Sequence, residues 1–540
     1  MKKILAVIFL QISIFSFAQT EDAWVYFTDK PEAAYYLANP LEMLSQRALD
    51  RRVAQNIPLD EKDVPIAISY INQITNSTGI AVKAKSKWLN ALHIRGTISD
   101  IENLENLAFV DHIEFADKSL NTNASARTAL QQSISQVNKN LEALATFGYG
   151  TSTNQIEMLN GHLLHQQDFT GSGKIIAVMD TGFVGVDATS PFQRLQDNNL
   201  ILGGYDFVNS STNFYGGGSH GTMVLSTMGG YVENQLVGTA PDAQYYLFIT
   251  EDINAENPVE ESFWVEAAEE ADRLGVDVIN TSLGYFGFDN PNYNYTYADM
   301  NGITSFISRG SEVAFSRGII CVTSAGNSGT SENPNIAVPA DAEHTLAVGA
   351  VMPDESYATF SSIGPSFDGR VKPDVMAQGK NAVVSDEMGN IVTSDGTSFS
   401  GPITAGLVAC LWQALPDKTN SQIVQLIKES ANLYATPNAQ FGYGIPDFNL
   451  IVQNALGTNQ FVENKFIVYP NPVASILNLK FPQDLKTGEI SIYNNLGQRI
   501  LLEKMTVNSS NLSLEDLGCG IYFYEIVSGN VSQRGKLIKK

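Results

Sequence analysis

The chain has 540 residues, which is too long for a single hydrophobic core and predicts several domains. Hydrophobic residues make up 44% and charged residues 17%, a balance that excludes a largely disordered chain. The net charge of −24 disfavours a nucleic-acid-binding protein, because that class needs a basic surface.

The N-terminus has the pattern of a signal peptide. Lys2 and Lys3 precede an apolar stretch, Ile4 to Phe15, and Ser16 and Ala18 are small residues at the two positions that a signal peptidase needs. The stretch is too short for a transmembrane helix, and no later segment has 18 consecutive apolar residues. We therefore expect residues 1–18 to be a leader for the Sec machinery and the mature protein to be soluble.

Residues 19–120 form a mixed segment. Strand-like runs at Ala23 to Thr28 and Ile80 to Ala84 flank helical stretches rich in Ala, Leu and Arg, which predicts a small α+β unit. Asp117 to Arg127 then carries small polar residues, and this composition predicts an exposed linker. Such linkers are the segments where proteolytic cleavage concentrates.

From about residue 121 to residue 456 the pattern is that of an α/β domain. Apolar runs of four to six residues alternate with helical periodicity, at Ile175 to Met179, Val276 to Ile279 and Ile319 to Val322. Runs that are apolar on both faces suit buried parallel strands. Residues 259–274 have apolar positions three to four residues apart, and Gly275 marks the end of that helix. The alternation predicts a parallel sheet flanked by helices.

The segment 467–540 shows the alternation typical of antiparallel strands. Leu477, Leu479 and Phe481 alternate with polar residues, and Asn494 to Gly497 is a turn signal. We predict a small antiparallel β-sandwich domain.

Three cysteines are too few for a disulfide framework in a chain of this length. Cys321 lies in an apolar run and Cys410 lies on an apolar helix. We expect two buried thiols that pack as small hydrophobes, with a disulfide or a nucleophilic role as the alternative.

Three polar residues lie where apolar elements begin or end. Asp180 follows directly on an apolar run, at the strand end where open α/β sheets place ligands. His220 and Ser398 each open a helix with an apolar face. A serine hydroxyl needs a base, a neutral imidazole can take its proton, and a carboxylate can fix the tautomer of that imidazole. Taken alone, each residue is better explained by a structural role, as a cap or as a core histidine.

At these residues the sequence resembles the subtilisin-like serine peptidases, or subtilases. The motifs stand in the family's order: Asp180-Thr181-Gly182, His220-Gly221-Thr222, Gly238-Thr239-Ala240-Pro241, Asn280-Thr281-Ser282-Leu283-Gly284, Ala325-Gly326-Asn327 and Gly396-Thr397-Ser398. The order Asp, His, Ser along the chain is the one quoted for subtilisin. The resemblance implies a subtilisin-like fold and a catalytic triad of Asp180, His220 and Ser398.

The resemblance also implies further site residues. In this family an asparagine amide, here Asn327, and the backbone N–H of the serine hold the oxyanion. The strand Ser282-Leu283-Gly284 would pair with the substrate backbone, and with Ala325 and Gly326 it would line the pocket for the residue before the cut. The family needs no catalytic cofactor. Subtilases often bind structural calcium, but no ligand spacing in this sequence assigns a metal site.

Some positions depart from the family pattern. Met223 stands where a histidine is common, Gln378 where a proline is common, and Ser400 where alanine is usual. These departures bear on specificity and rate and leave the reaction type unchanged. The segment Tyr285 to Tyr297 looks like an insertion beside the substrate strand, which either shapes the cleft or is a surface loop.

The flanking regions resemble parts of exported zymogens. The position of residues 19–120 is that of a pro-segment, which assists folding and blocks the cleft until it is cut away. We expect the cut within residues 117–127, with a permanent N-terminal domain as the alternative. From Tyr469-Pro470-Asn471-Pro472 to the end at Lys540, the chain resembles the sorting domain of the type IX secretion route, with a carbohydrate-binding or adhesive β domain as the alternative.

Together these patterns predict a secreted, monomeric serine endopeptidase that acts on proteins or peptides and is exported by the Sec and type IX machineries. A non-catalytic surface or adhesion protein on a protease-like fold is the second class. Loss of any triad residue or of Asn327 would have favoured that class, and none is lost.

Overall fold

The computed structural model describes residues 20–121, 147–456, 466–481, 485–507, 509–528 and 531–540. The chain divides into two compact units, Met1–Ala455 and Leu456–Lys540. The predicted signal peptide, residues 1–18, lies outside the described residues. No helix in the described part of the chain is long and apolar enough to cross a membrane.

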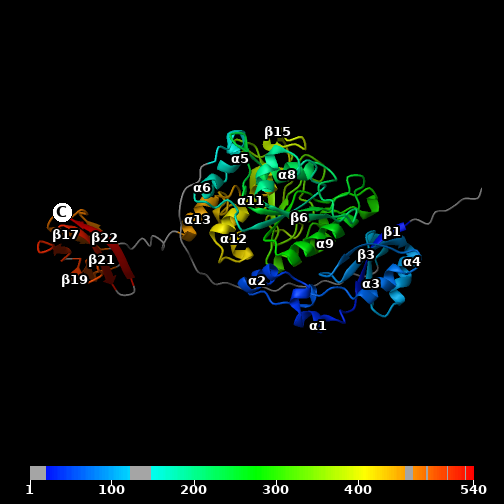
Figure 1. The fold of residues 1–540 in the computed structure, drawn as a ribbon, viewed down its shortest axis with the longest axis horizontal. Helices are drawn as coiled ribbons and strands as arrows, with labels where there is room; N and C mark the ends of the chain where they lie inside the picture. Colours follow the sequence, from blue (N-terminus) through cyan, green and yellow to red (C-terminus); the bar gives the residue numbers. More distant parts are fainter. Residues whose placement is uncertain (1–19, 122–146, 457–465, 482–484, 508, 529–530) are drawn as a thin grey trace, which may run out of the picture. The chain divides into compact units, whose positions relative to one another are not determined.

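A seven-stranded parallel sheet forms the centre of the first unit (Figure 1). In spatial order its strands are β13 (Val375–Gln378), β12 (Leu346–Val351), β11 (Ile320–Ser324), β10 (Val278–Thr281), β5 (Ile175–Asp180), β9 (Gln244–Ile249) and β6 (Ile201–Asp206). The strands from β13 to β5 are buried at every residue, which is the reason that they read as continuous apolar runs. The predicted parallel sheet is confirmed.

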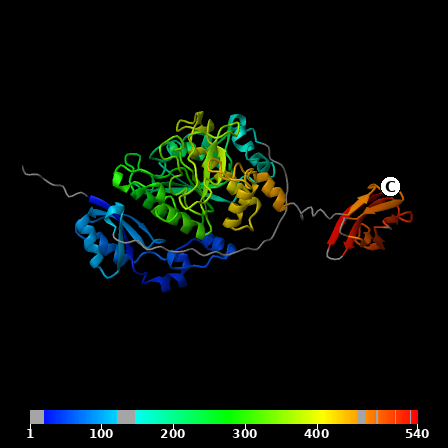
Figure 2. The same ribbon diagram turned by 180° about the vertical axis from the view of Figure 1, so that it is seen from behind.

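Helices cover the sheet and complete the catalytic body, the name used below for residues 147–456. They include α8 (His220–Gly229), α9 (Val259–Leu274), α10 (Phe306–Ser316), α11 (Thr397–Ala414), α12 (Asn420–Ser430) and α13 (Phe448–Leu456). Helix α8 contacts α11, and α9 contacts α10. The predicted end of α9 is confirmed, because Gly275 caps it with a φ of 84°. Figure 2 shows α9 on the side of the N-terminal region, seen from behind.

The N-terminal region, residues 20–121, has its own antiparallel sheet with the order β2-β3-β1-β4. Its elements are β1 (Thr20–Phe27), α1 (Ala33–Ala38), α2 (Gln46–Ala54), α3 (Ile68–Thr75), β2 (Ala81–Ser86), β3 (Ala91–Thr97), α4 (Ile98–Glu102) and β4 (Val110–Phe115). This arrangement agrees with the predicted α+β unit.

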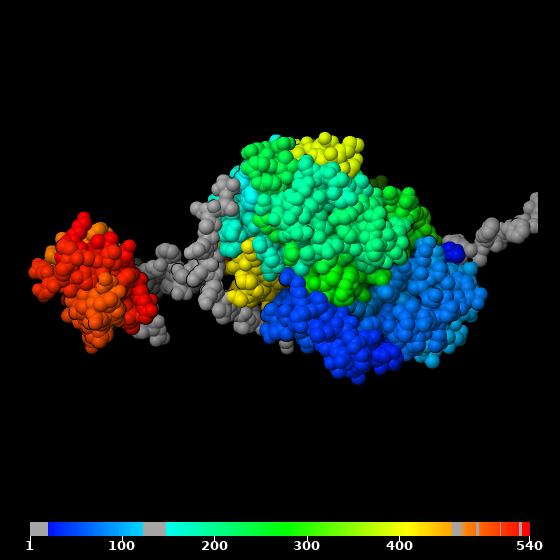
Figure 3. Space-filling view, in the orientation of Figure 1, coloured from blue at the N-terminus to red at the C-terminus, as the bar shows by residue number. Residues whose placement is uncertain are grey.

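The N-terminal region and the catalytic body share one hydrophobic cluster. Trp24 and Trp88 belong to the same buried cluster as Trp264 and Phe306 of the body, and the rings of Trp24 and Phe306 stack with centroids 5.2 Å apart. The Trp24 indole N–H also donates to Ser262 Oγ at 2.8 Å. Figure 3 shows the surface of residues 20–121, in blue, lying against the green surface of the body. The contact therefore includes a buried apolar part.

The predicted exposed linker begins with one buried residue. Asp117 is buried and accepts hydrogen bonds from Ser119, and Lys118 forms an ion pair with Asp299 at 2.8 Å. Asp117 therefore belongs to the packed N-terminal region, whereas Lys118, Ser119 and Asn121 are exposed, as predicted. Residues 122–127 lie outside the described residues.

The insertion at residues 285–297 has a role that neither alternative foresaw. Its residues Tyr293 and Tyr295 are buried. The Tyr293 hydroxyl donates to Glu21 at 2.9 Å, and the ammonium of Lys118 lies 4.3 Å from the centroid of the Tyr295 ring. The insertion thus packs against the N-terminal region.

The second unit is an antiparallel β domain with a core of its own. One sheet contains β16 (Ile467–Tyr469), β17 (Ile476–Lys480) and β20 (Asn511–Ser513), and the other contains β19 (Arg499–Thr506), β18 (Thr487–Tyr493), β21 (Gly520–Ser528) and β22 (Val531–Lys539). Leu477 and Leu479 from one sheet and Ile490 and Ile492 from the other share a buried cluster. The predicted antiparallel β fold is confirmed. In the first unit, Cys321 and Cys410 are the buried free thiols that were expected.

Candidate active site

Asp180 and His220 meet at the carboxyl end of the parallel sheet. Asp180 is the last residue of β5, and His220 is the first residue of α8. His220 Nδ1 lies 2.8 Å from Asp180 Oδ1. The Asp180 side chain is 1% exposed whereas that of His220 is 33% exposed, so the carboxylate is shielded from water and the imidazole is accessible.

Gly221 allows this close approach. A Cβ atom at that position would lie 2.5 Å from the carbonyl oxygen of Gly182 and 2.9 Å from Asp180 Cβ. Real Cβ atoms essentially never come so close to other heavy atoms. The glycine that follows His220 is therefore needed for α8 to reach the end of β5.

The charge of Asp180 acts on the imidazole. Its negative charge and its hydrogen bond raise the pKa of His220 above the ordinary value of 6.5, and burial opposes the rise only in part. A raised pKa makes the neutral imidazole a stronger base for the proton of a nearby hydroxyl.

Ser398 lies in the first turn of α11, beside the imidazole. The ring of its neighbour Phe399 has its centroid 6.1 Å from that of His220. The Ser398 hydroxyl donates to the backbone oxygen of Ser282 at 3.3 Å, and the described structure contains no hydrogen bond from it to His220. The hydroxyl therefore rests on the Ser282 carbonyl.

The backbone of Ser398 is held from outside the helix. Pro402, four residues later, has no N–H and cannot donate to the Ser398 carbonyl as a helical residue normally does. Ser282 Oγ takes that place and donates to Ser398 O at 2.9 Å. The proline and Ser282 together fix the backbone of the candidate nucleophile.

Asn327 faces the same turn of α11. Its Oδ1 accepts from Thr397 N at 2.9 Å and from Thr397 Oγ1 at 3.0 Å, which leaves its Nδ2 available as a donor. A Cβ built on Gly396 would lie 3.6 Å from both Asn327 Nδ2 and the backbone N of Ser398. The two nitrogens therefore flank one small space beside Gly396, which any side chain at that position would reduce.

The expected substrate strand is only partly as predicted. Strand β10 ends at Thr281, so Ser282, Leu283 and Gly284 lie beyond the sheet and are not paired as a strand. The neighbouring strands β5 and β11 each continue by only one residue beyond the partner of Thr281. Within the described chain, the N–H groups of Leu283 and Gly284 make no hydrogen bond, so they are available to an added strand.

The pocket residues Ala325 and Gly326 follow the end of β11. Ala325 is buried and Gly326 is half-buried. Gly326 N donates to Thr397 Oγ1 at 3.2 Å, which ties this segment to the turn that carries Ser398. The structure thus brings all of the predicted site residues to one edge of the sheet.

Glu251 is a nearby residue that sequence reasoning missed. It follows β9, and its carboxyl group accepts a hydrogen bond from the hydroxyl of Tyr285. Tyr285 directly follows residues 282–284, called the Ser282 segment below. Burial, with the nearby charges of Glu256 and Asp180, raises the pKa of Glu251. The hydrogen bond joins the loops on either side of β5. Its only sequence signal is an acidic residue soon after an apolar strand.

Metal ligands are not apparent. No three His, Cys, Asp or Glu side chains are gathered to hold a metal ion among the residues that the structure describes. The residues present therefore do not assign a calcium site.

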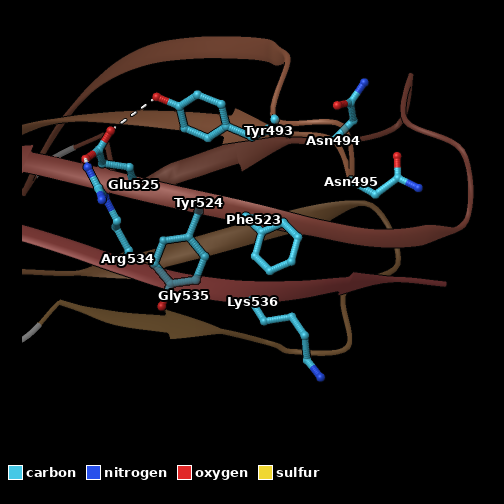
Figure 4. Close-up of a pocket in the computed structure, with 10 residues that line it drawn as sticks. Tyr493, Asn494, Asn495, Phe523, Tyr524, Glu525, Arg534, Gly535 and Lys536 are labelled. Carbon is cyan, nitrogen blue, oxygen red and sulfur yellow. Dashed lines mark hydrogen bonds and ion pairs between the residues drawn. The ribbon is translucent and has the colours of Figure 1, made fainter. Parts of the chain in front are cut away.

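A cavity of about 690 Å³ lies in the second unit. Figure 4 shows Tyr493, Asn494 and Asn495 at one side of it and Phe523, Arg534 and Lys536 at the other. None of the candidate catalytic residues lines this cavity.

Comparison with known proteins identifies three parts of the chain. Residues 171–444 match the Subtilase family. Residues 22–133 match the peptidase S8 propeptide domain of Bacteroidota, and residues 467–540 match a secretion system C-terminal sorting domain. A domain of the last kind directs type IX secretion to the cell surface or the extracellular space. The N-terminal region is therefore called the pro-segment below, and the second unit the sorting domain.

Two subtilisins agree with the family match. Subtilisin NAT from Bacillus subtilis subsp. natto is 31% identical over 294 residues, which cover 54% of this chain and 68% of that protein. Subtilisin E from Bacillus subtilis (strain 168) has the same identity and coverage. The crystal structure of MycP1 from Mycobacterium smegmatis is 21% identical, with a TM-score of 0.44, and the alignment covers 58% of this chain and 89% of that chain.

The match to the family spans half of the chain and includes every residue of the site described above. With its pro-segment and sorting domain, the chain has the organisation of an exported zymogen. The protein belongs to the subtilase family and is a serine-type peptidase.

Proposed function

We propose that this protein is a secreted serine endopeptidase that cleaves proteins or peptides. Ser398 is the nucleophile, His220 the general base and Asp180 the residue that orients and stabilises the imidazole. Asn327 and the backbone N–H of Ser398 hold the oxyanion. The observation that carries the proposal is the 2.8 Å hydrogen bond between His220 and the buried Asp180, beside the first turn of α11.

The first chemical step forms the acyl-enzyme. The Ser398 hydroxyl turns from the Ser282 carbonyl to His220 Nε2, gives its proton to that nitrogen and attacks the scissile carbonyl carbon. The developing O⁻ is held by Asn327 Nδ2 and Ser398 N, and each such donor contributes about 3–4 kcal/mol to the transition state. Asp180 stays ionised and stabilises the imidazolium.

The second half of the reaction restores the enzyme. The imidazolium of His220 protonates the leaving amine as the C–N bond breaks, which leaves an ester on Ser398. Water then gives a proton to His220 and attacks the ester carbonyl, and the proton returns to Ser398 Oγ as the acid product leaves. Electrons and protons balance without a cofactor.

The substrate backbone lies alongside the Ser282 segment in this proposal. The free N–H groups of Leu283 and Gly284 suit pairing with an extended peptide. Ala325 and Gly326 are small, so the pocket for the residue before the cut is open. We further propose that the enzyme is a monomer and that it reaches the type IX machinery after Sec export.

A fluorophosphonate probe tests the assignment. We expect the full chain, once its pro-segment has been cut away, to be labelled covalently at Ser398, and the Ser398→Ala variant to remain unlabelled. Ser400→Ala is the matched control, because Ser400 is buried two residues away and its hydroxyl donates to the Thr397 carbonyl, so this variant should label normally. Equal labelling of the wild type and Ser398→Ala would exclude Ser398 as the nucleophile.

Mass spectrometry of a peptide blocked at both ends tests the endopeptidase claim. Internal cleavage by the wild type but not by Ser398→Ala is expected. A folded wild-type protein that neither labels nor cleaves would favour the non-catalytic surface or adhesion protein.

A further inference from the structure

The pro-segment touches the catalytic body at a second place, apart from its sheet. Residues 29–64 are inserted between β1 and α3, carry helix α2 and have a small apolar cluster that includes Met43, Leu44 and Val64. Helix α2 reaches the body at residues just before β5, β10 and β11. This is the amino end of the parallel sheet, opposite to the carboxyl end that carries Asp180.

One face of α2 is made for this contact. Arg47, Arg51 and Gln55 are four residues apart, so they lie along one side of the helix. Arg47 donates to Gly275 O at 3.0 Å and to Gly173 O at 3.0 Å. Gln55 Nε2 donates to Gly318 O at 2.9 Å. These side chains of α2 therefore donate to backbone carbonyls in the three loops that precede β5, β10 and β11.

Arg51 joins the ends of two helices. Its guanidinium donates to Arg317 O, at 3.3 Å, and to Val276 O, which lie just after α10 and α9 respectively. It also pairs with the buried carboxylate of Asp272. The carboxyl end of a helix has unpaired carbonyls and partial negative charge, so a cation placed there is favourable. Arg51 therefore provides hydrogen-bond donors and a positive charge at the carboxyl ends of both α9 and α10.

A buried charge network completes the contact. Arg52 pairs with Asp272 of the body at 2.8 Å and with Asp63 of its own segment at 2.9 Å. Arg317 of the body pairs in turn with Asp63 at 3.3 Å and Asp60 at 2.8 Å. Side chains of the pro-segment and of the body contribute opposite charges to this network. These charges are therefore paired with one another only when α2 lies on the body. Removal of one partner of a buried pair is strongly destabilising, because it leaves the other charge buried without a partner.

We propose that the amino end of the catalytic body is a docking surface for a basic helix, and that α2 of the pro-segment is its occupant. The surface consists of Asp272, Asp277 and the carbonyls that follow α9 and α10. Among the described residues, no hydrogen bond or ion pair joins the pro-segment to Asp180, His220, Asn327 or Ser398. Helix α2 therefore sets how long the cut pro-segment stays bound, independently of any effect at the cleft.

The test uses the full chain with Ser398→Ala, so its outcome does not depend on the proposed catalysis. A recognition sequence for a site-specific protease is placed between residues 121 and 147, the chain is cut, and release of the pro-segment is followed by size-exclusion chromatography. The variant with both Arg47→Gln and Arg51→Gln should release the pro-segment at least about tenfold faster, because loss of buried charged partners acts mainly on dissociation. Arg51→Lys should also speed release, since an ammonium lacks the planar fork that spans both carbonyls.

Arg273→Gln is the matched control. Arg273 lies at the end of α9 near the same surface, but its exposed guanidinium pairs with Glu270 of its own helix, so release should not change. Release of the double variant at the wild-type rate would overturn the proposal.

Hydrogen exchange of the intact Ser398→Ala chain is the second measurement, because the variants also bear on folding. The double variant should exchange faster at residues 46–57 and 273–277 while β1 to β4 keep their protection. Loss of protection across the whole sheet would mean that α2 is only part of the pro-segment fold, and would also overturn the proposal. Should the double variant fail to fold, Asp277→Asn removes the Arg47 partner from the body side, and unchanged release would count against docking.

Discussion

Ser282 and Pro402 control the backbone of the candidate nucleophile. Because Pro402 leaves the Ser398 carbonyl without its helical donor, the hydroxyl of Ser282 is its substitute. In Ser282→Ala that carbonyl loses its partner, at a cost of about 1–3 kcal/mol. We expect kcat to fall about tenfold with little change in KM, since the defect lies at the reacting atoms. Steady-state kinetics on a peptide substrate measure this.

A double-mutant cycle separates this effect from general damage. In the variant with both Ser282→Ala and Pro402→Ala, the new N–H at position 402 donates to the Ser398 carbonyl and should recover part of the lost kcat. Losses that simply add would show that Ser282 acts in another way.

His220 determines the pH profile. Its pKa is raised above 6.5 by Asp180, and catalysis needs the neutral imidazole. The value of kcat/KM should therefore be constant at alkaline pH and fall as pH drops through a value above 6.5. Asp180→Asn removes the charge that raises the pKa, so its acid limb should move to lower pH, with a much lower plateau. A profile that stays flat from neutral pH to pH 4 would contradict this role.

At the scale of elements, the approach of α8 to β5 is set by Gly221. A Cβ there would lie 2.5 Å from Gly182 O, so Gly221→Ala must move α8 away from Asp180. Displacements of this size at a reacting geometry cost about a hundredfold in rate. We expect Gly221→Ala to lose activity to that extent while its far-UV circular dichroism stays native.

Gly229→Ala, at the other end of the same helix, is the control for this prediction. Its Cβ would lie 2.9 Å from the tip of the Leu195 side chain and 3.1 Å from the Tyr245 ring, so its nearest neighbours are side chains and not the backbone at the end of β5. Equal loss of activity in both variants would point to destabilised packing of α8 instead of a displaced imidazole.

The elements that sequence predicts best are those decided by local pattern. Continuous apolar runs located β5, β10 and β11, and Gly275 located the end of α9, because burial and a left-handed cap leave direct traces in the sequence. The family motifs located Asp180, His220 and Ser398, and the structure brings them to one edge of the sheet. The sequence pattern did not locate the end of β10 at Thr281, because the end of a strand depends on its neighbours.

Contacts between distant residues left no such trace. Helix α2 looked like an ordinary arginine-rich helix, and its partner Asp272 lies 221 residues away. Asp117 looked like part of a polar linker because its packing depends on the pro-segment fold. The role of Glu251 likewise depends on Tyr285, 34 residues later. Each of these pairings is decided by topology, which local patterns do not encode.

At the scale of the whole molecule, the chain separates its tasks between two compact units. The pro-segment and the catalytic body share a core and a buried charge network within Met1–Ala455. The sorting domain has a separate core that includes Val473, Ile492 and Leu537. A unit with its own core folds independently of its neighbour in general.

This division predicts that peptidase activity and export are separable. A chain that ends at Ala455 contains every candidate catalytic residue, so after removal of the pro-segment its kcat/KM should equal that of the full chain. Without residues 467–540 it should not pass the outer membrane, because that segment is the match to the sorting domain. Cell fractionation and a peptide assay measure the two properties in the same strains.

The full-length Ser398→Ala chain is the reciprocal control for this truncation. Its sorting domain is intact, so it should be exported with the wild type and yet be inactive. A truncated chain that is folded but inactive would mean that the sorting domain contributes to the site. A truncated chain that is still found outside the cell would mean that export is directed by other residues. Two independent units require both results: a truncated chain that is active but not exported, and a Ser398→Ala chain that is exported but inactive.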